Sequence, residues 1–364
     1  MPTEATDVVA ALASDLLYQL STAGQELFHT NMLYWLLRET PSASAPVAAC
    51  LGIDAPTNPE ASIRREWHNF DLYVDTGTAC RKLVLENKLH SLPRAEQLQE
   101  NYEKIPAAFR TNETVCVLLS LIEPAFKLPE PWIHLDYADL VRPLRDSAAI
   151  LRRDPDQRVT LEADLLDRYA QLVENLVALR VQYSIRAELD QPARLNDTER
   201  QRLQDARVLP LVEKLRIADL ATLVTQRNSN KFRIDIGYSN GTGIAQFFIE
   251  GSSGHTFAWQ YQAGQMRLAV VLKKTDDRSW VNRRPERERF VQQQFSGFFE
   301  FEAALPIDAS KLLGDYTGRR LPWLSYEPDF VYKYRPLQTG VTYNQLADIC
   351  TQLSSHVQRY AAAH

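Results

Sequence analysis

Apolar residues recur along this chain with two different periods, and the period changes near residue 230. Before that point they mostly recur at helical spacing, which predicts amphipathic helices. Between residues 232 and 272 they alternate with polar residues and are separated by turns rich in Gly, Ser and Asn, which predicts an antiparallel sheet. Segments with helical character are 1–20, 25–38, 93–109, 138–184, 196–223 and 344–360.

Strand-like segments stand between the helices of the first half. Residues 67–74 and 82–87 predict a hairpin, turned through Asp75–Thr78. Residues 114–122, which are apolar almost throughout, and residues 132–137 predict two further strands. A hairpin pairs its strands antiparallel, whereas a helical crossover joins parallel strands, so an α/β core with a mixed sheet is expected.

The length of 364 residues, 45% of them hydrophobic, suits a large core and two domains. We expect an α/β domain at residues 1–184, up to the end of the helical segment 138–184, and a second, α+β domain at residues 185–364. The second domain is expected to contain the antiparallel sheet, a strand at residues 330–334 and a final helix.

The strand at residues 82–88 ends in polar residues. Residues 83–85 are apolar on both faces, as in a strand that is buried on both sides, yet Glu86, Asn87 and Lys88 follow. Because side chains alternate along a strand, Glu86 and Lys88 share one face and Asn87 points to the other. With Asp71 on the preceding strand, two carboxylates can hold a divalent cation, and the lysine can orient a water or stabilise negative charge.

This arrangement resembles the PD-(D/E)XK nuclease superfamily. The Asp of the first motif matches Asp71, although Phe70 stands where the family usually has Pro. The (D/E)-x-K motif matches Glu86, Asn87 and Lys88.

Two flanking helices extend the resemblance over roughly residues 14–140. Residues 25–37 resemble the family's first helix, whose acidic residue joins the metal site and maps to Glu26. Downstream, Gln97 and Tyr102 match the glutamine-bearing helix that follows the catalytic strand in many members.

The resemblance implies a restriction-endonuclease-like core, with a mixed central sheet flanked by helices, and metal-dependent hydrolysis of phosphodiester bonds in nucleic acid. DNA is the expected substrate rather than RNA, in bacterial anti-phage defence or DNA processing. The expected ion is Mg²⁺, for which Mn²⁺ can substitute. The implied residues are Asp71, Glu86, Lys88 and Gln97 for catalysis, Glu26, Asp71 and Glu86 for the metal, and Tyr102 for the substrate.

Other interpretations of the same residues stay open. A Glu-x-Lys pair is usually a solvated ion pair, Asp71 alone could cap a turn, and Glu26 could complement a helix dipole. A non-catalytic nucleic-acid-binding or scaffolding protein on the same fold is the alternative function. It is favoured when motif residues are missing, whereas here each one is present.

Charge is spread unevenly along the chain. Its net charge is −5, but residues 1–180 carry 17 Lys and Arg against 26 Asp and Glu, a net of −9, which leaves +4 for residues 181–364. In that second part, Arg283, Arg284 and Arg287 follow Trp280, a combination that suits phosphate contacts and base stacking. A solvated loop explains the run equally well, and a protein partner or a second copy of the chain is the alternative occupant.

The four cysteines are scattered, with no C-x-x-C pair, which favours a reducing cytosol over disulfides or structural zinc. The first residues are acidic, so no signal peptide is expected. No apolar run is long enough to span a membrane. We therefore expect a cytoplasmic protein without membrane contact.

Overall fold

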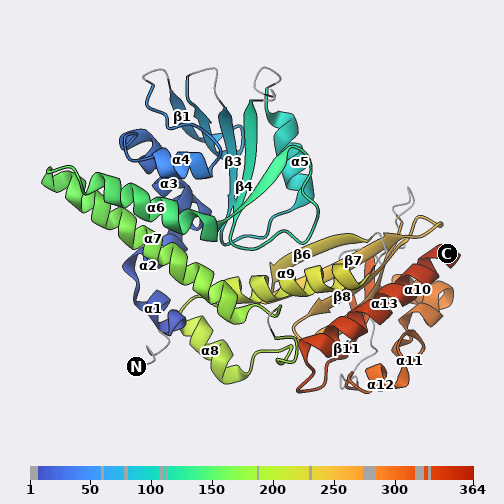
Figure 1. Cartoon of the computed structure of the whole chain (residues 1–364). Helices are drawn as coiled ribbons and strands as arrows, with labels where there is room; N and C mark the ends of the chain where they lie inside the picture. Colours follow the sequence, from blue (N-terminus) through green and yellow to red (C-terminus); the bar gives the residue numbers. More distant parts are fainter. Residues whose placement is uncertain are drawn as a thin grey trace. The chain divides into compact units, whose positions relative to one another are not determined.

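The chain divides into two compact units (Figure 1). Unit 1 comprises Met1–Tyr183 and Arg200–Leu215, and unit 2 comprises Ser184–Glu199 and Arg216–His364. The computed structural model describes residues 7–58, 61–77, 81–106, 110, 113–186, 188–228, 232–273, 284–315, 324–326 and 329–364.

Unit 1 contains a mixed five-stranded sheet in the order β1-β2-β3-β4-β5. The first three strands are antiparallel and β3, β4 and β5 are parallel, so the sheet is mixed, as expected. A helix lies in the connection from β3 to β4, whereas residues 121–131, which join β4 to β5, contain no helix. Their bounds are β1 Ser62–Trp67, β2 Phe70–Asp75, β3 Lys82–Lys88, β4 Thr114–Ser120 and β5 Trp132–Asp136.

Helices precede and follow this sheet along the chain, as expected of an α/β domain. In the crossover between β3 and β4 lies α5, and α6 and α7 pack on each other after β5. Within the described ranges, every helix is too short or too polar to cross a membrane. The bounds are α1 Val8–Ser14, α2 Leu16–Gly24, α3 Glu26–Glu39, α4 Ala45–Cys50, α5 Ala95–Lys104, α6 Tyr137–Leu151, α7 Gln157–Tyr183, α8 Asp197–Asp205 and α9 Leu209–Arg227.

The first helical segment is broken in two, contrary to the single helix expected over residues 1–20. Asp15 ends α1 and caps α2, because its side chain accepts a hydrogen bond from Tyr18 N at 2.8 Å. An aspartate at this position competes with the helical backbone bonds and favours a cap. The apolar spacing continues across the break, so the period alone did not reveal it.

The β1–β2 hairpin was also missed, because residues 67–74 were expected to form one strand. The structure turns at His68 and Asn69, whose φ angles are 50° and 69°, and pairs Trp67 with Phe70. Two central residues with positive φ make the type of two-residue turn that suits the twist of a hairpin. The strand before the turn, β1, is rich in charged residues and lacks the alternation that marks β2.

The two faces of the unit 1 sheet are covered by different helices. Leu98 and Ile105 of the α5 region pack with Tyr73 and Val84 on one face. The opposite face meets α3, which contacts β1, β2 and β3. Figure 1 shows α3 and α5 on opposite sides of the sheet. Because side chains alternate, Glu86 shares the α5 face with Val84, and Asn87 points toward α3.

Unit 2 contains a six-stranded antiparallel sheet in the order β10-β11-β9-β8-β7-β6, which confirms the sheet predicted from residues 232–272. Helix α13 (Tyr343–Ala363) packs on β7 and β8, where Trp259 Nε1 donates to Ser354 Oγ at 2.8 Å. The strands are β6 Arg233–Ser239, β7 Thr242–Glu250, β8 Thr256–Gln262, β9 Gln265–Val271, β10 Leu324–Tyr326 and β11 Phe330–Pro336, and short helices α10 Arg284–Phe295, η2 Ser296–Phe299, α11 Phe301–Ala304 and α12 Ile307–Ser310 precede β10.

Candidate active site

The strand register of unit 1 brings Asp71 and Glu86 together. The last paired residues of β2 and β3 are Leu72 and Leu85, so Asp71 and Glu86 are opposite one another one step further along. Directly opposite residues of an antiparallel pair share a face, with Cβ atoms about 5 Å apart. Asn87 N also donates a hydrogen bond to Asp71 Oδ2 at 2.6 Å. The two carboxylates therefore converge at the polar end of the hairpin.

Three side chains hold the Glu86 carboxylate, which is only 2% exposed. Lys88 Nζ lies 2.8 Å from Glu86 Oε1, and Gln97 Nε2 donates to the same oxygen at 2.9 Å. Asn101 Nδ2 donates to the other oxygen, Oε2, at 3.3 Å. Gln97 and Asn101 are four residues apart on α5, so they lie on the same face of that helix.

Glu26, the first residue of α3, is fixed by backbone groups that follow β3. Its Oε1 atom accepts hydrogen bonds from His90 N at 3.0 Å and from Ser91 N at 2.6 Å. These bonds join the start of α3 to the segment after the Glu-x-Lys motif, although more than 60 residues separate them in sequence.

On the other face of β3, Asn87 joins three elements. Its Nδ2 atom donates to the main-chain oxygen of Glu26 at 3.0 Å and to Thr30 Oγ1 at 3.1 Å, both on α3. Tyr137 on α6 donates its hydroxyl to Asn87 Oδ1 at 2.6 Å. Asn87 and Tyr137 are fully buried, so this neutral network is shielded from water. Breaking it would leave buried polar atoms unpaired.

Burial and the closeness of the carboxylates shift the pKa values of the residues at this site. Burial, followed by the negative charge of Glu86, raises the pKa of Asp71 to about 7. Burial also raises the pKa of Glu86, against the opposing effect of Lys88. The pKa of Lys88 is raised because the surrounding carboxylates, Glu86 foremost, outweigh its burial. The pKa of Glu26 is lowered, because its hydrogen bonds outweigh its burial.

The oxygen donors at this site suit a hard divalent cation. Buried like charges destabilise each other, and a cation between Asp71 and Glu86 would relieve that repulsion. Among the residues that the structure describes, no three His, Cys, Asp or Glu side chains converge closely enough to enclose a metal. Mg²⁺ does not require such a cage, since it is commonly held by one or two carboxylates with water and substrate phosphate. The Asp71–Glu86 pair therefore fits Mg²⁺.

Two buried histidines lie beside the carboxylates. The ring centroids of His29 and His90 are 5.8 Å apart, and His29 Nδ1 lies 3.1 Å from Tyr169 Oη. Burial lowers the pKa of His90 to about 4, and it lowers that of His29 as well. Both rings are therefore neutral at physiological pH. Lys214 Nζ donates to the His90 main-chain oxygen at 2.5 Å, which places a second ammonium group near the site.

Several of these neighbours were not anticipated from the sequence. Asn101 could have been predicted, because it follows Gln97 by four residues on a predicted helix and therefore lies on the same face of that helix. No sequence pattern indicated Tyr137 or Lys214, since they come from distant segments and only the tertiary fold brings them near β3.

Of the four predicted substrate-binding side chains, the structure describes only that of Tyr102. The ring of Tyr102 packs against the hydrophobic cluster of unit 1, as a packing residue would. Arg283 lies outside the described residues, and the side chains of Arg284 and Arg287 in α10 are likewise outside them. Nucleic-acid binding by these four residues stays a prediction.

Comparison with known proteins agrees with the geometry. A family model described as PD-(D/E)XK nuclease superfamily matches residues 14–171, which fall within unit 1 and include all of β1 to β5. Searches of curated proteins and of solved structures returned no match. The match confirms the resemblance to the PD-(D/E)XK nuclease superfamily over residues 14–171.

Proposed function

We propose that unit 1 is a Mg²⁺-dependent nuclease with a restriction-endonuclease-like core, which hydrolyses phosphodiester bonds in DNA in preference to RNA. One observation supports this above the others: Asp71 and Glu86 are opposite on adjacent strands, with Lys88 Nζ 2.8 Å from Glu86. A buried carboxylate whose pKa is raised to about 7 by burial and a second carboxylate is a costly arrangement unless a cation is bound there.

In this proposal, Asp71 and Glu86 hold the ion, and Glu26 adds negative charge beside them. The ion supplies charge neutralisation at the scissile phosphate and lowers the pKa of the attacking water. Lys88, whose ammonium group stays charged, stabilises the negative charge that gathers on the phosphate oxygens. Gln97 and Asn101 would fix the orientation of the Glu86 carboxylate, one through each of its oxygens, and so keep it in place for an ion.

The alternative, a nucleic-acid-binding protein without catalysis, is less consistent with this site. A binding protein needs cations that face the phosphates, whereas this site concentrates buried carboxylates. Carboxylates there would repel nucleic acid unless a cation intervenes.

The test is cleavage of plasmid DNA, linear DNA and RNA by the full chain, with Mg²⁺, with Mn²⁺ and with EDTA. We expect DNA cleavage that requires the divalent ion and falls at least about 1,000-fold in Asp71→Asn, because the variant lacks a charged ligand. Glu96→Gln is the matched control, since Glu96 is an acid on α5 that makes no hydrogen bond to the Glu86 carboxylate. Nucleic-acid binding without cleavage under every condition would support the alternative function instead.

A further inference from the structure

A segment outside the residues matched by the family model also belongs to unit 1. The match ends at residue 171, whereas residues 200–215 are part of the same compact unit. Two contacts fix this segment to the first helices of the chain. Tyr18 donates its hydroxyl to the Arg207 main-chain oxygen at 3.0 Å, and Arg202 forms an ion pair with Asp7. The position of the segment in unit 1 is therefore defined by specific bonds.

Lys214, near the end of this segment, reaches the loop that follows β3. Its Nζ atom donates to the His90 main-chain oxygen at 2.5 Å. The nitrogen of the same peptide group, Ser91 N, donates to Glu26 Oε1 at 2.6 Å. The peptide group between His90 and Ser91 is thus held from both sides, by an ammonium group at its oxygen and by a carboxylate at its nitrogen.

The two charged groups strengthen each other's hydrogen bonds. A cation at the carbonyl oxygen and an anion at the N–H group polarise a peptide in the same direction. Burial raises the pKa of Glu26, but the hydrogen bonds from Ser91 outweigh burial, so that the pKa is lowered and the carboxylate is ionised. Burial lowers the pKa of Lys214, and the negative charge of Glu26 opposes that shift. The geometry and the charges both couple Lys214 to Glu26.

We infer that Lys214 is a positioning residue of the candidate active site, which acts on the Glu26 carboxylate through the His90–Ser91 peptide group. This inference rests on the proposed function, in which Glu26 adds negative charge beside the ion. If the loop after β3 shifted, the Glu26 carboxylate bonded to it would shift as well, and Lys214 prevents this. The motifs of the family model are therefore not the whole site, because α9 completes it from outside the matched residues.

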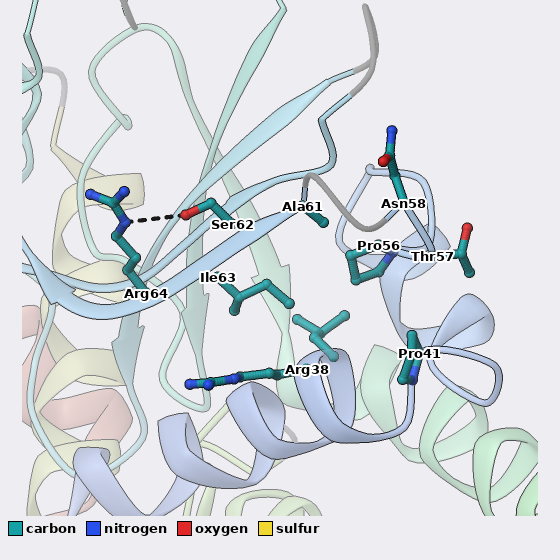
Figure 2. Close-up of a pocket in the computed structure, with 10 residues that line it drawn as sticks. Arg38, Pro41, Pro56, Thr57, Asn58, Ala61, Ser62, Ile63 and Arg64 are labelled. Carbon is teal, nitrogen blue, oxygen red and sulfur yellow. Dashed lines mark hydrogen bonds between the residues drawn. The ribbon is translucent and has the colours of Figure 1, made fainter.

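Arg38 is a cation of unit 1 that serves as a control. It lies near the end of α3, at a pocket of about 480 Å³ that residues 61–64 also line (Figure 2). It donates to the Tyr34 hydroxyl and pairs with Glu39. Along α3 it follows Glu26 by 12 residues, which is about 18 Å. Arg38→Gln therefore removes one positive charge from unit 1 without touching the loop after β3.

The experiment compares Lys214→Met, Lys214→Arg and Arg38→Gln in the full chain by steady-state cleavage of plasmid DNA with Mg²⁺. Methionine keeps an unbranched side chain but lacks the charge and the donors. We expect Lys214→Met to lower kcat roughly 10- to 100-fold with KM little changed, as for residues that orient a metal ligand. Lys214→Arg should keep most of the activity, because a guanidinium group also donates to a carbonyl oxygen. Arg38→Gln should leave both constants unchanged.

A double-mutant cycle with Glu26→Ala tests whether Lys214 acts through that carboxylate, and it requires no substrate. Thermal unfolding of the metal-free protein is measured for Lys214→Met, for Glu26→Ala and for the double variant. Because both side chains hold one peptide group, the double variant should lose less in melting temperature than the sum of the two single losses. In the cleavage assay, Lys214→Met should lower kcat by less than about 3-fold further once Glu26 is absent.

Wild-type kcat and KM in Lys214→Met would overturn the inference and leave the nuclease proposal intact. A raised KM with kcat preserved would also overturn it, since Lys214 would then be a contact to the substrate. A similar fall of kcat in Arg38→Gln, or additive effects on unfolding, would do the same. If the wild-type chain cleaves neither DNA nor RNA with Mg²⁺ or Mn²⁺, the proposed function itself is overturned, and the unfolding cycle still decides whether Lys214 holds Glu26.

Discussion

The two faces of β3 at its polar end have opposite characters. On the α5 face, Glu86 and Lys88 form a charged pair 2.8 Å apart, next to Asp71. On the α3 face, Asn87 makes only neutral hydrogen bonds with its side chain, to Glu26, Thr30 and Tyr137. One strand therefore carries groups suited to chemistry on one side and groups suited to fixing its position on the other. The middle residue of a Glu-x-Lys motif is here as constrained as its neighbours.

The comparison predicts that Lys88→Ala has the largest effect on turnover among substitutions on β3 that leave both carboxylates in place. In the proposed function Lys88 stabilises charge that develops mainly in the transition state, so kcat should fall roughly 10²- to 10³-fold with KM little changed. Steady-state kinetics on plasmid DNA would measure both constants. Lys104→Ala, at the exposed end of α5, is the control. Equal decreases in affinity and rate would show that Lys88 is a ground-state phosphate contact.

Asn87→Leu tests the other face and should have a smaller effect on rate. Leucine keeps a similar volume but leaves Tyr137 Oη and Thr30 Oγ1 without their partner. We expect activity or metal affinity to fall roughly 10- to 100-fold, as for residues that orient metal ligands. The Mg²⁺ concentration for half-maximal activity separates this role from simple destabilisation.

Tyr137→Phe removes one of the same hydrogen bonds while keeping the ring, so it should retain most of the activity. Its free energy of unfolding should fall by about 1–2 kcal/mol.

If Asn87→Leu changed stability but not the Mg²⁺ requirement, the α3 face would have no part in positioning the site.

The smallest effect concerns stability and pH. The pKa of Asp71 is raised to about 7 in the folded protein, so the native state keeps a proton that the unfolded chain releases between about pH 4 and 7. The metal-free protein should therefore become less stable as pH rises through that window. Asp71→Asn removes the free-energy cost of ionising this buried carboxyl group. Above pH 7 the variant should therefore raise the free energy of unfolding of the metal-free protein by about 1–2 kcal/mol. The full pKa shift of Asp71 corresponds to an upper limit of roughly 4 kcal/mol.

Thermal unfolding at about pH 4 and about pH 7.5 would measure that difference, which should nearly vanish at the lower pH. At the higher pH, Mg²⁺ should stabilise the wild-type protein more than the variant, since ligand binding to the native state adds stability. A wild-type protein whose unfolding there is indifferent to Mg²⁺ would contradict a cation between Asp71 and Glu86.

Much of the structure of unit 1 could be predicted from the sequence, because the patterns that indicate it are local. Period two along β2 and β3 determined which side chains share a face, and four-residue spacing on a helix would also have identified Asn101. The break at Asp15 and the turn at His68 were missed, because a cap and two left-handed residues leave the apolar pattern almost unchanged. Contacts of Tyr137 and Lys214 depend on chain segments meeting in space, which no single-sequence pattern encodes.

The domain boundary was predicted at residue 184, where the helical segment at residues 138–184 ends. The compact units change there, between Tyr183 and Ser184, but Arg200–Leu215 falls in unit 1 and includes Lys214. Helix α9 contributes residues to both units, since it runs from Leu209 to Arg227. Whether residues 1–184 and 185–364 fold independently therefore stays a prediction. A nuclease fragment that ends at residue 184 would lack Lys214.

The hydrogen bonds from the backbone to the carboxylates give this site its own spectroscopic reporters. The amides of Asn87, His90 and Ser91 each donate to Asp71 or Glu26. An amide proton bonded to a carboxylate senses whether that carboxylate is charged, protonated or drawn toward a cation. Its resonance and its exchange with solvent deuterium would therefore report binding of the proposed metal residue by residue, before any substrate is present. Asn87 would report on Asp71, and His90 and Ser91 would report separately on Glu26.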